Sequence, residues 1–331
     1  MRRAVRIAAA VVAAVTLVLG GVVALYGTLV MDGPSGSEVT LIVPRGAGTG
    51  AIAQSLADAG VVNGAWQVML ASRIEQPEAT LKAGEYSFPA GVSAAEAVRI
   101  MKEGRSVVRR LTVPEGLTSA QVMQLLAEER ALSGDVPEPP PEGTLLPETY
   151  HFSYGDSRSD MVGRMMSMMD AALAEAWPKR APNAPVSSPA EAVILASIVE
   201  KETSVAEERA MVAGVFANRL ARSMRLQSDP TVVYALTGGS GSLGRALTRE
   251  DWKVASPYNT YASDGLPPGP IANPGRASIE AVLQPARHDY LYFVADGSGG
   301  HAFARTLSGH NRNVARWRAF RREQAETPAQ E

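Results

Sequence analysis

An uncharged stretch near the amino terminus, residues 7–31, sets the first limit on the fold of this chain. A helix over these 25 residues, at about 1.5 Å per residue, can cross a hydrocarbon core of about 30 Å. The basic residues 1–6 precede it, which keeps the amino terminus in the cytoplasm and exports the remainder. A cleaved signal peptide is the alternative, but the stretch exceeds the roughly 7 to 15 residues of a signal core and lacks a clean A-x-A exit. We therefore predict a retained transmembrane helix.

Composition limits the classes of protein to which the chain can belong. Its 331 residues suffice for about two domains. A net charge of −2, without a long basic run, argues against a nucleic-acid-binding protein. The sequence has no cysteine, which removes disulfides, cysteine-ligated zinc and thiol nucleophiles. Its four histidines are scattered and fit no metal-binding spacing, so we predict no metal and no cofactor.

Short strands and helices follow a turn-rich linker, residues 32–37. A strand, a Pro-x-Gly turn and a helix occur in this order three times. The predicted strands are 38–43, 86–88 and 107–113, and the predicted helices are 49–58, 94–102 and 119–128. Because the spacing is unequal, the pattern does not indicate a solenoid. We predict an α+β fold in which residues 38–105 resemble a LysM-type module, which binds the N-acetylated glycan of cell walls. A small α+β arm that positions the rest of the chain is the alternative.

A strongly indicated helix leads into the polar segment 200–203 (EKET). Ser188, Pro189 and Glu191 form an N-terminal capping pattern. Residues 192–199 are almost all apolar and point in nearly every direction, so this helix is predicted to be buried on most sides. Glu200 and Glu202 lie about 160° apart around its axis. The two carboxylates therefore cannot serve one site while the helix stays regular.

A second helix is predicted to follow, capped by Thr203 or Ser204 with Glu207 as the capping-box partner. Its one-sided apolar stripe consists of Val212, Val215, Phe216 and Leu220.

Glu200 is predicted to lie at the junction of the two helices, largely out of water. Burial raises the pKa of a carboxyl group, as a general acid near neutral pH requires. On the helix pattern alone, however, an ion pair with Arg209 or Arg219 is the favoured role for Glu200.

A loop rich in proline and glycine, residues 256–275, cannot form a helix or a sheet. Its hydroxyls, amides and flat rings suit sugar hydroxyls and acetamido groups. The candidates are Tyr258, Asn259, Thr260, Tyr261 and Asn273. A rigid structural loop is the alternative.

The remaining segments complete the prediction. Asp229 is placed to cap a helix that has Pro230 at its first position. A helix from Ser278, a strand over 290–294 and a terminal helix to about Arg318 follow, and residues 321–331 are predicted to be disordered.

Several sequence blocks carry a resemblance to a known family. They are residues 196–203 (ASIVEKET), 215–220 (VFANRL), 224–232 (MRLQSDPTV), 258–261 (YNTY), 265–271 (GLPPGPI), 273–275 (NPG), 290–297 (YLYFVADG) and 299–301 (GGH). The chain resembles the MltG or YceG-like family of endolytic murein transglycosylases, single-pass inner-membrane enzymes that cut nascent peptidoglycan. The resemblance covers essentially the whole chain. The chain departs from the family pattern at Pro141, Thr144, Leu146, Glu148 and Gly309, which affects contacts of the cleft wall and not the reaction.

The resemblance implies that Glu200 is the catalytic acid and then base. It would protonate the oxygen between N-acetylmuramic acid and N-acetylglucosamine and then deprotonate the muramic C6 hydroxyl, which attacks C1 to give a 1,6-anhydro end. Because no water is consumed, a second carboxylate is dispensable. If one exists, Asp229 is the candidate, although capping a helix is its favoured role. Gln227, Ser228 and His301 join the candidate substrate-binding residues.

The expected organisation follows from these assignments. It comprises a cytoplasmic tail (1–6), a transmembrane helix (7–31), a linker (32–37), a LysM-like domain (38–105), a YceG-like catalytic domain (106–320) in the periplasm and a disordered tail (321–331). The expected partners are peptidoglycan strands, the inner membrane and peptidoglycan synthases. Two alternatives stay open: a non-catalytic wall-binding scaffold, and a two-carboxylate hydrolase that uses Glu200 and Asp229.

Overall fold

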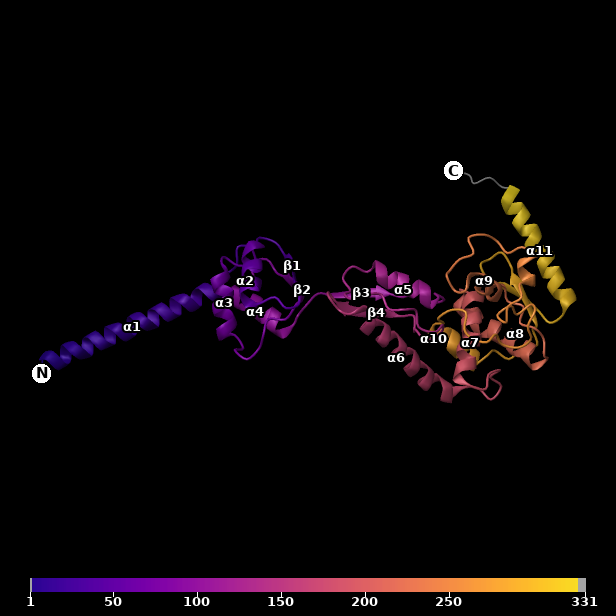
Figure 1. Cartoon of the computed structure of the whole chain (residues 1–331), viewed down its shortest axis with the longest axis horizontal. Coiled ribbons are helices and arrows are strands. Elements are labelled where there is room, and N and C mark those ends of the chain that lie inside the picture. Colours follow the sequence, from indigo (N-terminus) through magenta and orange to yellow (C-terminus); the bar gives the residue numbers. More distant parts are fainter. Residues whose placement is uncertain (1, 327–331) are drawn as a thin grey trace. The chain divides into compact units, whose positions relative to one another are not determined.

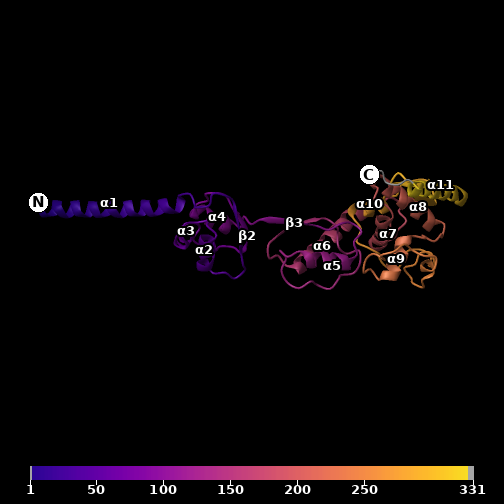
Figure 2. The same cartoon turned by 90° about the horizontal axis from the view of Figure 1, so that it is seen from above.

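A computed structural model of the protein describes residues 2–326, with side chains described to residue 324. It is a mixed α+β structure made of two compact units. Unit 1 contains the chain up to Arg110 together with Ala131–Ser133 and His151–Asp156, and unit 2 contains the remaining described residues. Figure 1 labels the elements along the chain, and Figure 2 shows them after a quarter turn.

Unit 1 begins with a single long helix, α1 (Arg2–Val30). It is apolar and long enough to cross a membrane, and its most apolar window is not buried in the structure. The helix starts at Arg2, so it includes the basic residues that we expected to precede the span. Only its end joins a core: Leu29 is 1% exposed and packs with the apolar residues of unit 1.

The folded part of unit 1 is one antiparallel strand pair with three helices. Its elements are β1 (Val39–Val43), α2 (Thr49–Asp58), α3 (Ala65–Ile74), β2 (Gly84–Phe88) and α4 (Ala94–Glu103). β1 pairs with β2 from Val39 opposite Phe88 to Val43 opposite Gly84. Tyr86 and Phe88 are fully buried in the core. The predicted strands and helices are confirmed, whereas α3 was not predicted, since its N-cap residue, Gly64, has no side chain to signal a helix start.

Unit 2 holds most of the remaining elements. They are β3 (Val108–Thr112), α5 (Ser119–Glu128), β4 (Thr149–Ser153), α6 (Arg158–Ala176), α7 (Pro189–Glu202), α8 (Arg209–Ala221), α9 (Asp229–Thr237), α10 (Arg276–Leu283), β5 (Tyr292–Ala295), β6 (His301–Ala304) and α11 (Leu307–Glu326), with the start of β3 and the end of β4 assigned to unit 1. β3 pairs with β4, and β5 pairs antiparallel with β6. The many short elements are joined by long loops, so helix packing supplies the core.

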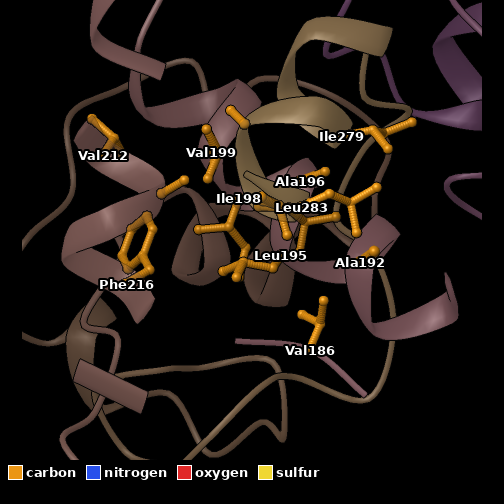
Figure 3. Close-up of a cluster of buried hydrophobic side chains, with 14 of the residues drawn as sticks. Val186, Ala192, Leu195, Ala196, Ile198, Val199, Val212, Phe216, Ile279 and Leu283 are labelled. Atoms are coloured by element: carbon orange, nitrogen blue, oxygen red, sulfur yellow. The ribbon is translucent and has the colours of Figure 1, made fainter. Parts of the chain in front are cut away.

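The core of unit 2 surrounds α7, as Figure 3 shows. Leu195, Ala196 and Ile198 are completely buried. They pack with residues of α8, such as Phe216, and of α10, such as Leu283. The prediction of a helix buried on most sides is confirmed. This burial fixes the carboxyl end of α7, where Glu200 and Glu202 lie.

The start of α7 follows its predicted capping pattern. The Ser188 hydroxyl accepts a hydrogen bond from the backbone N–H of Glu191 at 3.2 Å, and Pro189 opens the helix. The predicted cap of the next helix is wrong. A 3₁₀ turn, η2 (Ala206–Glu208), precedes α8, and the Thr203 hydroxyl accepts the N–H of Val205. The buried stripe of α8 agrees with prediction, since Val212, Val215 and Phe216 are at most 1% exposed.

The last helix extends further than predicted. α11 continues to Glu326, whereas we expected disorder from Arg321. Arginine, glutamate, glutamine and alanine all have high helix propensity, which outweighs the high polarity of this segment. The prediction of disorder is therefore wrong for residues 321–326, and residues 327–331 lie outside the described part of the chain.

Candidate active site

Glu200 lies at the end of α7 in a network of charged residues. One of its carboxylate oxygens accepts a hydrogen bond from the backbone N–H of Gly275 at 2.9 Å. The other lies 3.6 Å from the Arg209 guanidinium, and the Glu200 side chain is only 5% exposed. The expected ion pair with Arg209 is therefore present. Arg219 has other partners, because its guanidinium donates to the backbone carbonyls of Leu226 and Leu291.

Glu115 completes this network from the loop before α5. Its carboxylate lies 3.2 Å from Arg209. Burial raises the pKa of Glu115 above its usual value, the neighbouring Glu200 charge adds to the rise, and Arg209 opposes it. The Lys201 ammonium donates to the carbonyl of Gly116 at 3.1 Å, which ties the same loop to α7.

Glu202 has a different environment from that of Glu200. The Ser228 hydroxyl donates to its carboxylate at 2.5 Å. Burial raises the pKa of Glu202 to about 7, against the lowering effect of the Ser228 hydrogen bond. The negative charge of Asp229 contributes to the rise, while His301 and Arg219 lower it. A carboxyl group with this pKa can hold a proton at neutral pH and release it again.

Asp229 is the first residue of α9, and it does not cap the helix as predicted. The phenol of Tyr261 donates to one oxygen of its carboxylate at 2.6 Å, and the indole N–H of Trp252 donates to the same oxygen at 3.1 Å. Ser228 is the N-cap residue instead, and its side chain bonds to Glu202. The carboxylate of Asp229 is therefore held by aromatic donors from the downstream loop.

A cleft of about 430 Å³ opens beside these residues. Its lining includes Lys201 from α7 and Asp229 and Tyr234 from α9. The other lining residues are Thr118, Gln121, Pro230, Val233, Thr237, Gly241, Ser242, Leu243, Arg245 and Ile271. Glu202 is joined to this wall through Ser228, the neighbour of Asp229. The segment 228–229 therefore bonds to Glu202 through Ser228 and lines the cleft through Asp229.

Several predicted substrate-binding residues are buried. Ser228, Asn259, Thr260 and Asn273 are at most 2% exposed. The Asn259 amide donates to the carbonyls of Trp252 and Val254, both at 2.9 Å. The Thr260 hydroxyl accepts the N–H of Ser228 at 3.0 Å. These bonds fix the loops that carry Asp229 and Tyr261.

Asn273 links three segments of unit 2. Its amide donates to the carbonyl of Leu117 at 3.0 Å, and its side-chain oxygen accepts the N–H of Leu145 at 3.0 Å. Its backbone carbonyl accepts the N–H of Gly116 at 3.0 Å. Asn273 thus supports the loop that carries Glu115.

The other predicted residues lie at the edges of this arrangement. Gln227 has a positive φ of 50° and donates its N–H to the carbonyl of Thr260. The ring of Tyr258 packs on that of Tyr234, with centroids 4.8 Å apart. His301 pairs with Glu208: its Nδ1 lies 2.6 Å from one carboxylate oxygen, and its N–H donates to the other at 2.8 Å.

Of the predicted residues, Ser228 bonds directly to Glu202, and Tyr261 bonds to Asp229, the neighbour of Ser228. Asn273 bonds to Gly116, in the loop that carries Glu115. Sequence reasoning did not include Glu202 or Trp252 among the candidate site residues. The helical spacing already placed Glu202 on a different face from Glu200, but nothing in the spacing favoured either face. Within residues 2–324, no group of three or more histidine, aspartate or glutamate side chains could hold a metal ion.

Comparison with known proteins agrees with the sequence resemblance. The model of the YceG-like family matches residues 41–316. An endolytic murein transglycosylase of Bacillus subtilis is 30% identical over 332 residues, which cover 89% of this chain and 90% of the relative. One from Streptococcus pneumoniae is 29% identical over 340 residues, which cover 88% of this chain and 60% of the relative.

A solved structure extends the agreement to the fold. The crystal structure of a yceG-like protein from Listeria monocytogenes is 33% identical and aligns with a TM-score of 0.53, covering 84% of this chain and 99% of that one. The chain belongs to the YceG-like family.

Proposed function

We propose that this protein is a lytic transglycosylase that cuts peptidoglycan strands internally. The relatives named endolytic murein transglycosylases support the substrate class and the reaction. The observation that carries the proposal is the Glu202 carboxyl group, whose pKa burial raises to about 7 and which bonds to Ser228, the neighbour of the cleft-lining Asp229. Such a group can donate and accept a proton at neutral pH.

Sequence analysis predicted Glu200 as the acid, and we propose Glu202 for this role instead. Both carboxylate oxygens of Glu200 already have partners, the Arg209 guanidinium at 3.6 Å and the backbone N–H of Gly275 at 2.9 Å. Burial and, after it, the charge of Asp229 disfavour ionisation of Glu202, against the opposing effect of the hydrogen bond from Ser228. In this proposal, Glu200 orders the loop of Glu115 and Gly275 next to the site. Glu200 as the acid stays a prediction that the same experiment tests.

The reaction needs one carboxyl group in two roles. Protonated Glu202 gives its proton to the oxygen between N-acetylmuramic acid and N-acetylglucosamine, and the bond from that oxygen to C1 of the muramic residue breaks. The Glu202 carboxylate then takes the proton of the C6 hydroxyl, whose oxygen forms a new bond to C1. The products are a 1,6-anhydro end and a free 4-hydroxyl group, with Glu202 protonated again. Because no water enters, a second carboxylate is not required, unlike in two-carboxylate glycosidases.

Digestion of purified glycan strands tests the proposal. Wild type, Glu202→Gln and Glu200→Gln would be compared by mass spectrometry of the released ends. We expect anhydro ends from wild type and a loss of at least about 100-fold in rate for Glu202→Gln. Loss in Glu200→Gln with full activity in Glu202→Gln would return the role to Glu200. Reducing ends in place of anhydro ends would indicate a two-carboxylate hydrolase that uses Glu200 and Asp229.

A non-catalytic wall-binding scaffold is the second candidate. The observation in its favour is the ion pair of Glu200 with Arg209, since a carboxylate held in this way is suited to a structural role. A scaffold would pull down glycan strands without cutting them. Cleavage by wild type and its loss in Glu202→Gln would exclude this candidate.

We also propose that α1 anchors the protein in the inner membrane, with its amino terminus in the cytoplasm and unit 2 in the periplasm. Arg2, Arg3 and Arg6 at the start of α1 support this orientation. Protease added to spheroplasts would then digest unit 2, whereas resistance in intact spheroplasts would contradict the orientation.

The last part of the proposal concerns glycan binding by unit 1. We propose that residues 38–105 act as a LysM-like module on the glycan and that peptidoglycan synthases are partners of the protein. The antiparallel pair β1–β2 packed with α2 and α3 supports a small α+β module. Its exposed Trp66 offers an aromatic surface to the glycan. Unchanged glycan pull-down after Trp66→Ala would argue against wall binding through this residue.

A further inference from the structure

Trp252 is an exposed tryptophan on a tightly held turn of unit 2. It lies in the 3₁₀ helix η3 (Asp251–Lys253), and 37% of its surface is exposed. The Asn259 amide, which is completely buried, donates hydrogen bonds to the carbonyls of Trp252 and Val254. The backbone on both sides of the indole is therefore fixed from the interior of the protein.

The residue before Trp252 fixes the same turn from the other side. The Arg245 guanidinium donates two hydrogen bonds to the Asp251 carboxylate, at 2.6 and 2.9 Å. The backbone N–H and the hydroxyl of Thr248 also donate to it, at 2.7 and 2.8 Å. The bond from Arg245, followed by those from Thr248, holds the pKa of Asp251 well below its usual range. This arrangement positions the Trp252 turn without using the indole.

The indole itself is oriented by two contacts. Its N–H donates to Asp229 at 3.1 Å, and the Tyr261 phenol donates to the same oxygen at 2.6 Å. The rings of Trp252 and Tyr261 stack with centroids 5.8 Å apart and planes 29° apart. One edge and one face of the indole are thus occupied, and the exposed fraction leaves ring surface open to a ligand.

The exposed part of an aromatic ring contributes little to folding, because this part of its surface remains in contact with water. Hydrogen bonds from Arg245, Thr248 and Asn259 nevertheless fix the turn. The hydrogen bond from the indole N–H to Asp229 fixes the ring. Asp229, which binds the indole, and Arg245, which binds the turn, also line the cleft of about 430 Å³. A rigid aromatic surface at a polar cleft is suited to binding, since ordering it costs no further entropy.

We infer that Trp252, supported by Tyr261, is a platform on which one pyranose ring of the glycan stacks during cleavage. The C–H groups on one face of a pyranose ring are apolar and pack on an indole face, while the hydroxyls at the ring edge bond to polar groups. Asp229 and Arg245 provide such polar groups in the adjoining wall. The inference rests on the proposed function, because it assigns a substrate subsite to the same cleft.

Steady-state cleavage of purified glycan strands by the full-length protein in detergent tests the platform. Trp252→Ala removes the ring and should raise KM on the order of tenfold, with kcat changed less than KM. Trp252→Phe keeps an aromatic face but loses the N–H, so its KM should lie much closer to that of wild type. Lys253→Ala, on the same turn, is the matched control and should be unchanged. Equal KM increases in the Ala and Phe variants would overturn the platform and assign the effect to the bond with Asp229.

Binding of chitopentaose, an oligomer of N-acetylglucosamine, provides a readout that does not depend on cleavage. Calorimetry with wild type should detect binding that Trp252→Ala weakens by a similar factor and Lys253→Ala does not. If wild type binds the oligomer through Trp252 but cuts no strand, the proposed function fails and the platform stands. Equal affinity in wild type and Trp252→Ala, or absence of binding to wild type, would overturn the platform. Circular dichroism of each variant would show that the fold is retained.

Discussion

Glu200 and Glu202 lie two residues apart on α7, and their carboxylates bond to different parts of unit 2. Glu200 accepts the N–H of Gly275, and Glu202 accepts the hydroxyl of Ser228. The helical turn between them separates their surroundings, as their angular spacing requires. Arg209 lies beside Glu200, whereas burial, with a contribution from the charge of Asp229, raises the pKa of Glu202. One helix end therefore holds two carboxylates that have no shared contact partner among these residues.

Replacement of Glu202 should stabilise the protein at high pH. Its folded-state pKa of about 7 exceeds the ordinary value of 4.5, so the group favours folding below pH 4.5 and loses this contribution as pH rises through 7. Glutamine cannot ionise. We expect similar melting temperatures for Glu202→Gln and wild type at pH 4, and a more stable variant at pH 8, by on the order of 2 kcal/mol.

Thermal unfolding of the full chain in detergent at both pH values checks this expectation. Glu207→Gln is a suitable control, because Glu207 is exposed in the neighbouring turn. A stability gain of Glu202→Gln that shrinks as pH rises would contradict the assigned pKa.

Removal of Arg209 should destabilise unit 2. The guanidinium lies between Glu115 at 3.2 Å and Glu200 at 3.6 Å, and only 13% of its side chain is exposed. Without it, two carboxylates face each other, one of them in a buried position. We expect Arg209→Gln to cost on the order of 3 kcal/mol at pH 7 and less at pH 4, where protonation of Glu115, whose pKa burial raises, relieves the repulsion.

A double-mutant cycle isolates this interaction. Adding Glu200→Gln to Arg209→Gln removes one of the two charges and should recover part of the loss, which gives a coupling energy of about 1 to 3 kcal/mol. Urea denaturation of the four proteins supplies the values. Strict additivity of the two single changes would mean that the pair makes no contribution to folding.

The elements that the sequence predicted best are those specified by local patterns. The cap at Ser188 and the apolar run of α7 depend on neighbouring residues, and both are present in the structure. The environments of the two glutamates depend on residues far along the chain. Glu202 meets Ser228, 26 positions later, and Glu200 meets Gly275, 75 positions later. No local pattern contains these contacts, so the choice between the two carboxylates required the fold.

The predicted binding residues show the same limit. Polar side chains in a stiff loop can face a substrate or fix the loop itself, and their identities do not distinguish the two roles. Asn259 and Asn273 are buried and bond to backbone groups, whereas Tyr261 bonds to the cleft-lining Asp229. Trp252 was not singled out, because a single aromatic residue in an irregular segment forms no pattern.

Asn273→Ala should therefore lower stability more than substrate affinity. The change removes the acceptor for the N–H of Leu145 and the donor for the carbonyl of Leu117, both bonds being 3.0 Å long. Leaving such buried groups unpaired costs about 2 to 4 kcal/mol. Asn183→Ala is the control, since Asn183 is exposed and the hydrogen bond that it accepts from Arg287 is long, at 3.5 Å. A raised KM with an unchanged melting temperature would instead support a direct contact with substrate.

Two helical glycines of unit 2 should respond to alanine with opposite signs. A Cβ atom at Gly214, in α8, would lie 2.5 Å from the carbonyl oxygen of Ala286 and 2.6 Å from Nε2 of His288. Since α8 is held against this segment by bonds from Asn218 to the carbonyls of His288 and Tyr290, the backbone cannot move away freely. We expect Gly214→Ala to cost about 1 to 3 kcal/mol through overpacking.

Gly163, in α6, has no atom within 4 Å of the corresponding position among the described residues. Alanine there loses less backbone entropy on folding than glycine, so Gly163→Ala should stabilise the protein by about 0.5 to 1 kcal/mol. Melting temperatures of the two variants and wild type measure both effects under one condition. Stabilisation by Gly214→Ala would show that α8 does not pack closely on residues 286–288. Destabilisation by Gly163→Ala would contradict the free space around the Cβ position of residue 163 in α6.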